Sequence, residues 1–314
     1  MINQIHNEPC LDTLRKMPND FLDCVISSPP YWQLRDYGYN GQWGLEPTFQ
    51  QYLQHLWEMM DEIHRVLKPS GTCWINLGDT YNNSGWAGDR KDKYDDQPIG
   101  AIGTKAGRGG QKGFPDKCLV LIPHRFAIGC IDRGWIVRND IIWAKRNGMP
   151  EPVTDRFTKK HEYIFLMTKS KKYYFDLDAI RDRHIWESDK RNNGKRHEYS
   201  EDAKSHNDKK IGAKAVSFNP KGKNPGSVSD FWDVMTKPSS VKHYASYNVD
   251  LITKPILGGC PEGGLIYDPF MGSGTTAIHA IMNNRNFIGS EMSTDYLEIA
   301  NKRISDVLSS PKLF

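Results

Sequence analysis

The six residues Ser27-Ser28-Pro29-Pro30-Tyr31-Trp32 combine hydroxyl groups, rigid carbonyls and aromatic rings directly after an apolar stretch, residues 23–26. Proline fixes φ and has no backbone N–H, so two successive prolines end a strand and hold the nearby carbonyls in a fixed direction. Those carbonyls can accept hydrogen bonds from an exocyclic amine, and a tyrosine ring offers a flat face for a planar base. The segment predicts a pocket for an extruded nucleobase, although a rigid structural turn explains it equally well on its own. The candidate catalytic residues are Ser28, Pro29, Pro30 and Tyr31.

A second group of chemically useful residues lies near the C-terminus, in Asp268-Pro269-Phe270-Met271-Gly272-Ser273-Gly274-Thr275-Thr276. The pattern predicts a strand over 264–268, a glycine turn and a helix over 275–282. Glycines let the backbone approach a ligand closely. Glu291 ends the next predicted strand, 286–291. In a doubly wound sheet such strand ends lie side by side, and an acid there suits the two ribose hydroxyls of a nucleoside.

Two familiar phosphate-binding loops do not fit this glycine turn. A P-loop requires lysine after its last glycine, and Thr275 follows Gly274 instead. A dinucleotide-binding loop requires GxGxxG, and only Gly272-x-Gly274 is present. A purely structural turn stays open as an alternative, but the flanking residues and the spaced Glu291 favour a nucleoside site.

The composition is that of a soluble globular protein. The 314 residues suffice for one large domain or two modest ones, with 25% charged and 38% hydrophobic residues and a net charge of +4. We find no apolar run of the roughly 18 residues that a spanning helix needs and no signal peptide, so we expect a cytoplasmic protein without membrane association. The six cysteines are scattered without metal-ligand spacing, so no metal is expected.

The chain divides into three zones. In residues 1–180, predicted helices at 49–67 and 119–132 alternate with predicted strands at 25–27, 72–77, 135–143 and 163–167, which indicates a layered α/β fold. Residues 82–117 are rich in glycine and charge and predict a long mobile loop. Residues 228–314 return to the α/β pattern.

Residues 181–227 form a basic insert with almost no apolar periodicity. One interpretation is a solvated, partly disordered segment, and the other is an element that contacts phosphates and orders on binding. The two interpretations are compatible. The candidate DNA-contacting residues in it are Lys190, Arg191, Lys195, Arg196, Lys209 and Lys210.

Together, the Ser-Pro-Pro-Tyr and Asp-Pro-Phe-x-Gly-Ser-Gly-Thr-Thr blocks resemble the DNA amino-methyltransferases, which methylate cytosine N4 or adenine N6 using S-adenosylmethionine. The Ser-Pro-Pro-Tyr block comes first and the cofactor block last, an order that resembles the β-class of that family. Residues 7–12, 75–81, 156–163 and 243–256 resemble further family blocks. The resemblance implies a doubly wound, mostly parallel, Rossmann-like methyltransferase sheet built from 1–180 and 228–314, with 181–227 as the target-recognition insert.

The same resemblance implies a cofactor, a partner and a set of binding residues. The cofactor is S-adenosyl-L-methionine and the partner is double-stranded DNA. Family members with serine in the position of Ser28 more often methylate cytosine N4, so cytosine is favoured over adenine N6. A cognate restriction endonuclease and the choice between monomer and homodimer stay open. The implied cofactor-binding residues are Asp12, Asp268, Pro269, Phe270, Gly272, Ser273, Gly274, Thr275, Thr276, Glu291 and Met292.

Other classes of protein fit the sequence less well. A cytosine-C5 methyltransferase needs a nucleophilic cysteine after proline, and Pro9-Cys10 is the only such dipeptide. It precedes the first strand predicted above, so we expect Cys10 to be structural. A catalytically silent DNA-binding module is disfavoured by the intact catalytic and cofactor blocks. An RNA methyltransferase is disfavoured because no added RNA-binding domain is evident.

Overall fold

The structure is a computed structural model that describes residues 1–82, 111–148, 151, 153–181, 230–235 and 249–309. Within these residues eight strands form one sheet in the order β1-β8-β7-β2-β3-β5-β4-β6. Strand β5 is antiparallel to β3 and β4, and the other pairs are parallel. The strands are β1 (Gln4–His6), β2 (Leu22–Ser27), β3 (Leu67–Leu77), β4 (Ile136–Ala144), β5 (His161–Thr168), β6 (Phe231–Asp233), β7 (Leu265–Asp268) and β8 (Asn286–Ser290).

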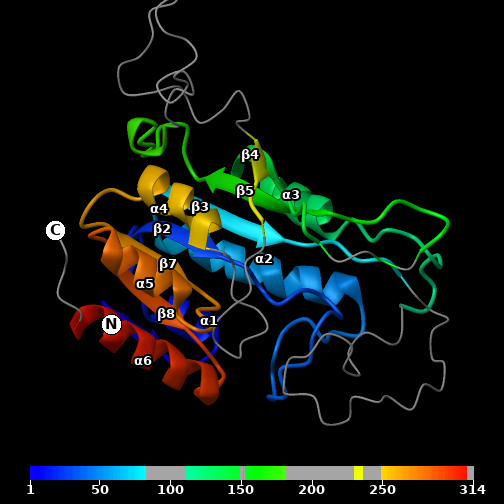
Figure 1. Cartoon of the computed structure of the whole chain (residues 1–314), viewed down its shortest axis with the longest axis horizontal. Helices are drawn as coiled ribbons and strands as arrows, with labels where there is room; N and C mark the ends of the chain where they lie inside the picture. The colour runs from blue at the N-terminus through cyan, green and yellow to red at the C-terminus, as the bar shows by residue number, and fades with distance from the viewer. Residues whose placement is uncertain (83–110, 149–150, 152, 182–229, 236–248, 310–314) are drawn as a thin grey trace, which may run out of the picture.

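Helices cover both faces of this sheet, as Figure 1 shows. Helices α1 (Cys10–Lys16), α2 (Phe49–Val66) and α3 (Ile122–Asp132) share one core with strand residues such as Val25 and Tyr267. Helices α4 (Val249–Gly259), α5 (Thr275–Met282) and α6 (Thr294–Ser309) share the other core with their strand neighbours Ile26 and Ile266. Successive strand residues point to opposite faces of the sheet, and helices cover both faces. Side chains on both faces are therefore buried. The predicted doubly wound, mostly parallel fold is confirmed.

Helix α2 shows how local sequence sets an element that the site depends on. Its apolar residues recur at helical spacing, and Leu53, Leu56 and Ile63 are fully or almost fully buried against the sheet. Thr48 caps the start of the helix by accepting a hydrogen bond from the Gln51 backbone N–H at 3.2 Å. The helix ends at Val66, one residue before the predicted end, and the chain continues directly into β3.

The sheet order places the two chemically active blocks next to each other. Strand β2 pairs with β7 in parallel, with Val25 opposite Tyr267. From β2 the chain proceeds to β3 on one side, whereas β7 and β8 from the C-terminal flank lie on the other. The carboxyl ends of β2 and β7 therefore form the switch point of the sheet, which is where ligands bind in folds of this type.

Some predictions fall on residues outside the described ranges. The basic insert beyond residue 181, with its six candidate DNA-contacting residues, lies outside them, as do residues 83–110 of the predicted loop. The division into 1–180, 181–227 and 228–314 stays a prediction, although strands from both flanks share one sheet.

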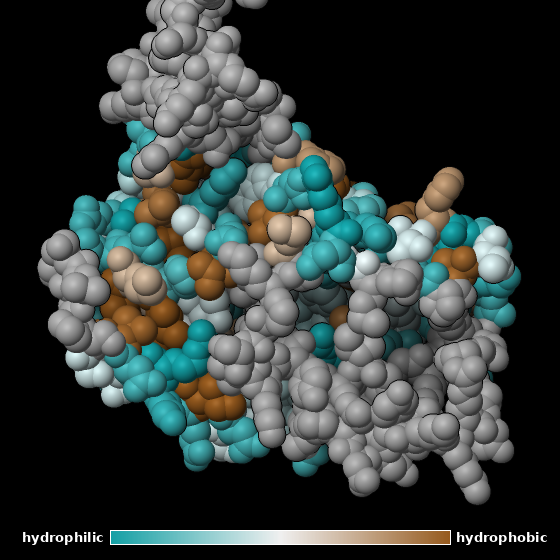
Figure 2. All heavy atoms as spheres, viewed as in Figure 1, coloured by the Kyte–Doolittle hydropathy of each residue, from teal (hydrophilic) through white to brown (hydrophobic). Residues whose placement is uncertain are grey.

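The helices in the part of the chain that the structure describes include no candidate for a membrane span. No helix there combines the length and the hydropathy needed to cross a bilayer. On the face drawn in Figure 2, hydrophobic side chains lie in separate groups among hydrophilic ones.

We predict that Gly129→Ala destabilises the fold, although alanine ordinarily stabilises a helix relative to glycine by about 1 kcal/mol. A Cβ at Gly129 would lie 2.3 Å from the indole of Trp57, whose Nε1 donates to the Phe126 carbonyl at 3.2 Å. Overpacking of this kind costs about 1–3 kcal/mol. Chemical denaturation should show a lower free energy of unfolding, whereas Ile128→Ala, at a position 60% exposed, should change it little. A stabilised Gly129→Ala variant would contradict this packing of α3 on α2.

Candidate active site

The two blocks meet at a buried carboxylate. Ser27 at the end of β2 donates from Oγ to Oδ1 of Asp268 at the end of β7, over 3.0 Å. The same carboxylate accepts from the Phe270 backbone N–H at 3.0 Å and from Thr276 Oγ1 at 2.6 Å. Asp268 is only 1% exposed. Its side chain joins β2, the glycine turn and the start of α5, so it organises the site from within.

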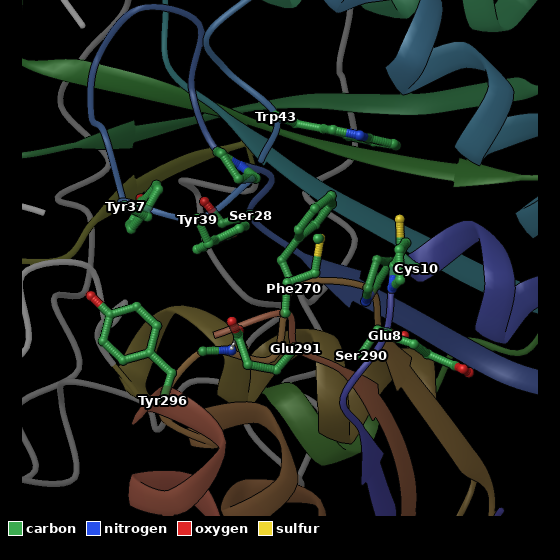
Figure 3. A pocket seen from close by; sticks show the side chains of 15 residues that line it. Glu8, Cys10, Ser28, Tyr37, Tyr39, Trp43, Phe270, Ser290, Glu291 and Tyr296 are labelled. Carbon is green, nitrogen blue, oxygen red and sulfur yellow. Dashed lines mark hydrogen bonds between the residues drawn. The ribbon is translucent and has the colours of Figure 1, made fainter. Parts of the chain in front are cut away.

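A cavity opens beside this junction, at the carboxyl ends of the strands (Figure 3). Counted together with the open space at its mouth, it has a volume of about 710 Å³. Residues from both blocks and from the segments around them line it: Glu8, Pro9, Cys10, Ser28, Pro30, Tyr37, Tyr39, Trp43, Pro269, Phe270, Gly272, Ser290, Glu291, Met292 and Tyr296.

Aromatic rings supply much of the cavity wall. The ring of Tyr37 lies 6.4 Å from that of Tyr39 and 6.5 Å from that of Tyr296, measured between centroids. Trp43 and Phe270 meet edge to face at 5.4 Å. Figure 3 shows Tyr296 and Tyr37 at one side of the cavity and Phe270 between them and Cys10. Such surfaces favour a flat, amphipathic ligand such as a nucleoside.

Glu291 supplies the acid of the cavity. Its carboxylate accepts from the backbone N–H groups of Gly272 and Ser293, each at 2.8 Å. Burial raises the pKa of this carboxyl, and the two hydrogen bonds act in the opposite direction. A carboxylate has about four lone-pair sites, so two bonds leave capacity for ligand hydroxyls.

The glycine turn requires glycine at two places. Gly272 and Gly274 have φ of 54° and 81°, a left-handed region that residues with a side chain rarely adopt. At Gly274 a Cβ would also lie 3.0 Å from the Cβ of Ala300 on α6. The turn can therefore close tightly over Glu291 and bring α6 against α5.

The residues of the Ser-Pro-Pro-Tyr block take different positions. Ser28 and Pro30 line the cavity, whereas Pro29 is buried. The Pro30 carbonyl accepts from Tyr52 Oη at 2.8 Å, which occupies one of its two lone pairs. Tyr31 lies behind the cavity wall, where its ring rests on Gly78 so closely that a Cβ there would be 2.6 Å away. The stacking of Tyr31 on a base stays a prediction.

Five of the predicted cofactor-binding residues line the cavity: Pro269, Phe270, Gly272, Glu291 and Met292. The others from the same block lie behind it. Ser273 accepts from Arg303 Nη1 at 2.9 Å, Thr276 is bound to Asp268, and neither is exposed to the cavity. These residues, with Gly274 and Thr275, shape the turn.

Asp12 does not line the cavity, so its contact with the cofactor stays a prediction. Helix α1 begins at Cys10, which places Asp12 on the outer side, where its half-exposed carboxylate pairs with Arg15 at 3.5 Å. Glu8, four residues earlier in the same segment, lines the cavity instead.

Sequence reasoning missed the aromatic wall. Tyr37, Tyr39 and Trp43 belong to the loop that follows the Ser-Pro-Pro-Tyr block, and Tyr296 lies in the first turn of α6, only five residues after Glu291. The clustering of aromatic residues directly after both blocks was the signal that could have identified them.

The cysteine that lines the cavity is not a reactive thiol, and no group of metal-binding side chains is found among the residues that the structure describes. Burial raises the pKa of the Cys10 thiol to about 12, so the sulfur stays protonated and is a poor nucleophile.

Comparison with known proteins identifies the family. A family model described as DNA methylase, for N6 and N4 methyltransferases, matches residues 22–302. The chain is 35% identical to the type II methyltransferase M.Cfr9I of Citrobacter freundii, over 94% of this chain and 85% of that protein. It is also 35% identical to M.SmaI of Serratia marcescens, over 93% and 87%. The chain therefore belongs to the N6/N4 family of DNA methylases, which confirms the resemblance drawn from the sequence.

Solved structures share the fold. PvuII DNA methyltransferase, described as cytosine-N4-specific, has a TM-score of 0.61 at 16% identity, covering 97% of this chain and 90% of that one. A putative DNA modification methylase from Thermus thermophilus, complexed with S-adenosyl-L-methionine, has a TM-score of 0.58 at 20% identity, covering 98% and 96%.

We predict that Asp268→Ala lowers the free energy of unfolding by at least about 3 kcal/mol, because it leaves three donors without an acceptor. Those donors are Ser27 Oγ, the Phe270 N–H and Thr276 Oγ1. Asp12→Ala is the matched control, because its exposed pair with Arg15 contributes at most about 0.5 kcal/mol. Equal unfolding free energies for the two variants would refute the organising role of Asp268.

Proposed function

We propose that this chain is a site-specific DNA methyltransferase that moves a methyl group from S-adenosyl-L-methionine to cytosine N4. One observation carries the proposal: the hydrogen bond from Ser27 to Asp268 joins the two blocks beside a single cavity, which Ser28 and Glu291 both line. Ser28, the proposed amine-binding group, and Glu291, the proposed nucleoside-binding group, thus line the same cavity.

The residues of the cavity fit this cofactor. Glu291 has spare acceptor capacity for ribose hydroxyls, and Phe270, Tyr37 and Tyr296 offer rings to a purine and to the apolar parts of the ligand. When bound, the cofactor supplies a methyl group already activated on a sulfonium. Pro269, Gly272 and Met292 complete the cofactor side of the cavity.

The chain has to orient the poorly nucleophilic amine of the base. Ser28 Oγ and the Pro29 carbonyl accept its hydrogens and localise its lone pair, while Tyr31 holds the flipped base by stacking. Alignment of this kind can supply several kcal/mol, up to about 7–11 in the best intramolecular cases. Extrusion of the base costs a few kcal/mol, which stacking and edge contacts offset.

Cytosine is favoured over adenine because of Ser28. Serine stands where adenine-specific members of the family usually carry Asp or Asn. The hydroxyl lines the cavity and can accept from either amine, so the support is the family pattern rather than the local chemistry.

The DNA would be held by residues outside the cavity. We infer that Lys190, Arg191, Lys195, Arg196, Lys209 and Lys210 of the insert contact phosphates. The similarity to type II methyltransferases supports a role in restriction-modification, with a cognate endonuclease as partner.

Expression in a methylation-free host should yield N4-methylcytosine at one recognition sequence. Sequencing that separates N4-methylcytosine from N6-methyladenine is the measurement, and the Tyr31→Ala variant, which loses the stacking ring, is the inactive control. N6-methyladenine at the site would overturn the choice of base. Unmodified DNA from a folded, DNA-binding protein would favour the silent-module alternative.

Glu291→Ala should weaken S-adenosylmethionine binding about ten- to a hundredfold, because hydrogen bonds from hydroxyls to a charged acceptor are worth about 1.5–3 kcal/mol. Isothermal calorimetry measures the affinity, and thermal unfolding checks that the variant is folded. Glu298→Ala, at an exposed position of α6, is the control. Equal affinity for both variants would refute the role of Glu291.

A further inference from the structure

A hydrogen-bonded network lies directly behind Ser28. Tyr31 Oη donates to Oε2 of Glu162 at 2.7 Å. Asn76 Nδ2 donates to the same Tyr31 oxygen at 2.9 Å and to the same Glu162 oxygen at 3.2 Å. These groups come from the loop after β2, from β3 and from the start of β5, so three segments converge on one carboxylate.

Lys145, which directly follows β4, ion-pairs with the other oxygen of Glu162, Oε1. The side chains of Glu162 and Lys145 are only 13% and 22% exposed, and the Lys145 ammonium also lies 4.2 Å from the ring centre of Trp143. An ionised carboxylate has acceptor atoms only, whereas an ammonium group has donors only. A neighbouring hydroxyl that bonds to Glu162 must therefore donate its proton to the carboxylate.

The first consequence concerns Tyr31. Because both Glu162 oxygens can only accept, Tyr31 must direct its hydroxyl proton toward Glu162. Burial, and after it the charge of Glu162, raise the pKa of the Tyr31 phenol well above its usual range, so that proton is retained. The Tyr31 oxygen is then left with lone pairs for other donors.

The second consequence concerns Ser28. Its hydroxyl donates to Tyr31 Oη at 3.4 Å, and its oxygen lies 3.4 Å from Asn76 Nδ2, whose two hydrogens serve Tyr31 and Glu162 over shorter distances. With its proton directed to Tyr31, Ser28 retains a lone pair on the oxygen that lines the cavity. Serine could otherwise act as donor or acceptor, and only the acceptor state suits an amine.

We infer that Glu162, held by Lys145, is a positioning residue for methyl transfer: it sets the direction of the hydrogen-bond chain from Ser28 through Tyr31. Ser28 thereby presents an acceptor to the exocyclic amine. The inference rests on the proposed function, in which Ser28 binds that amine. Glu162 itself touches neither the base nor the cofactor in this arrangement.

The first test is Glu162→Gln. The glutamine oxygen will face the Lys145 ammonium, so its NH₂ group will face Tyr31. Tyr31 must then accept from position 162, which reverses the direction of the hydrogen bonds between Ser28, Tyr31 and residue 162. We expect kcat to fall about ten- to a hundredfold, the range that corresponds to one hydrogen bond to a charged group. KM for DNA and the calorimetric affinity for S-adenosylmethionine should stay within about twofold.

The second test is rescue. In the double variant Glu162→Gln with Lys145→Met, the glutamine oxygen is free to accept from Tyr31 again, and methionine retains packing against Trp143. We expect kcat to recover in part. If the ion pair were purely structural, kcat in the double variant would fall below that of Glu162→Gln, because both charged partners are lost.

The third test is a double-mutant cycle with Tyr31→Phe, which removes the hydroxyl that transmits the effect. In that background Glu162→Gln should have no further effect on kcat. Glu62→Gln, which alters an ion pair with Arg65 on α2 away from the site, is the matched control and should behave as wild type.

The outcomes separate this inference from the proposed function. If wild-type protein transfers no methyl group to DNA, the proposed function fails. If wild type is active, then unchanged kcat in Glu162→Gln, additive effects in the cycle, or a double variant weaker than Glu162→Gln would each overturn the role of Glu162.

Discussion

The buried carboxylate of Asp268 connects segments that are far apart in the chain. A charge removed from water is tolerated only when its lone pairs are satisfied, and Ser27, Phe270 and Thr276 provide donors for them. These donors come from β2, from the glycine turn and from α5. A slip of β7 along β2 would leave the carboxylate short of donors, so this one group fixes how the strand ends align. The cavity depends on that alignment because its walls continue directly from both strand ends.

Ser28 belongs to two environments, and this gives the site its organisation. On one side it lines the aromatic cavity, and on the other it lies 3.4 Å from Tyr31 Oη. The loop after Tyr31 is fixed by its own bonds: Trp32 Nε1 donates to the Glu46 carbonyl at 2.9 Å, and the Gly44 N–H donates to the Glu46 carboxylate at 2.9 Å. The aromatic wall is thus held in place by polar contacts behind it, and a rigid wall costs less to order on binding.

The sequence predicted the features that arise from local pattern. The period of α2, the strands β2, β7 and β8, and the acid at Glu291 all follow from spacing within short windows. Strands β1 and β6 were missed because three residues are too few to show a period. Glu162 was overlooked as a partner of Tyr31 because the two are 131 residues apart and meet only through strand pairing. The start of α1 directs Asp12 away from the cavity and leaves Glu8 beside it, a difference that depends on the exact first residue of the helix.

The permuted order of the two blocks has a simple physical basis. The entropic cost of closing a loop rises only with the logarithm of its length, so the separation of 241 residues between Ser27 and Asp268 adds little over a shorter one. The geometry instead demands that β2 and β7 be parallel neighbours, so that their carboxyl ends open on the same edge. Any chain order that meets this demand can build the same cavity. What the order cannot alter is the spacing within each block, because Ser28 must directly follow β2 and Glu291 must directly follow β8, beside the glycine turn.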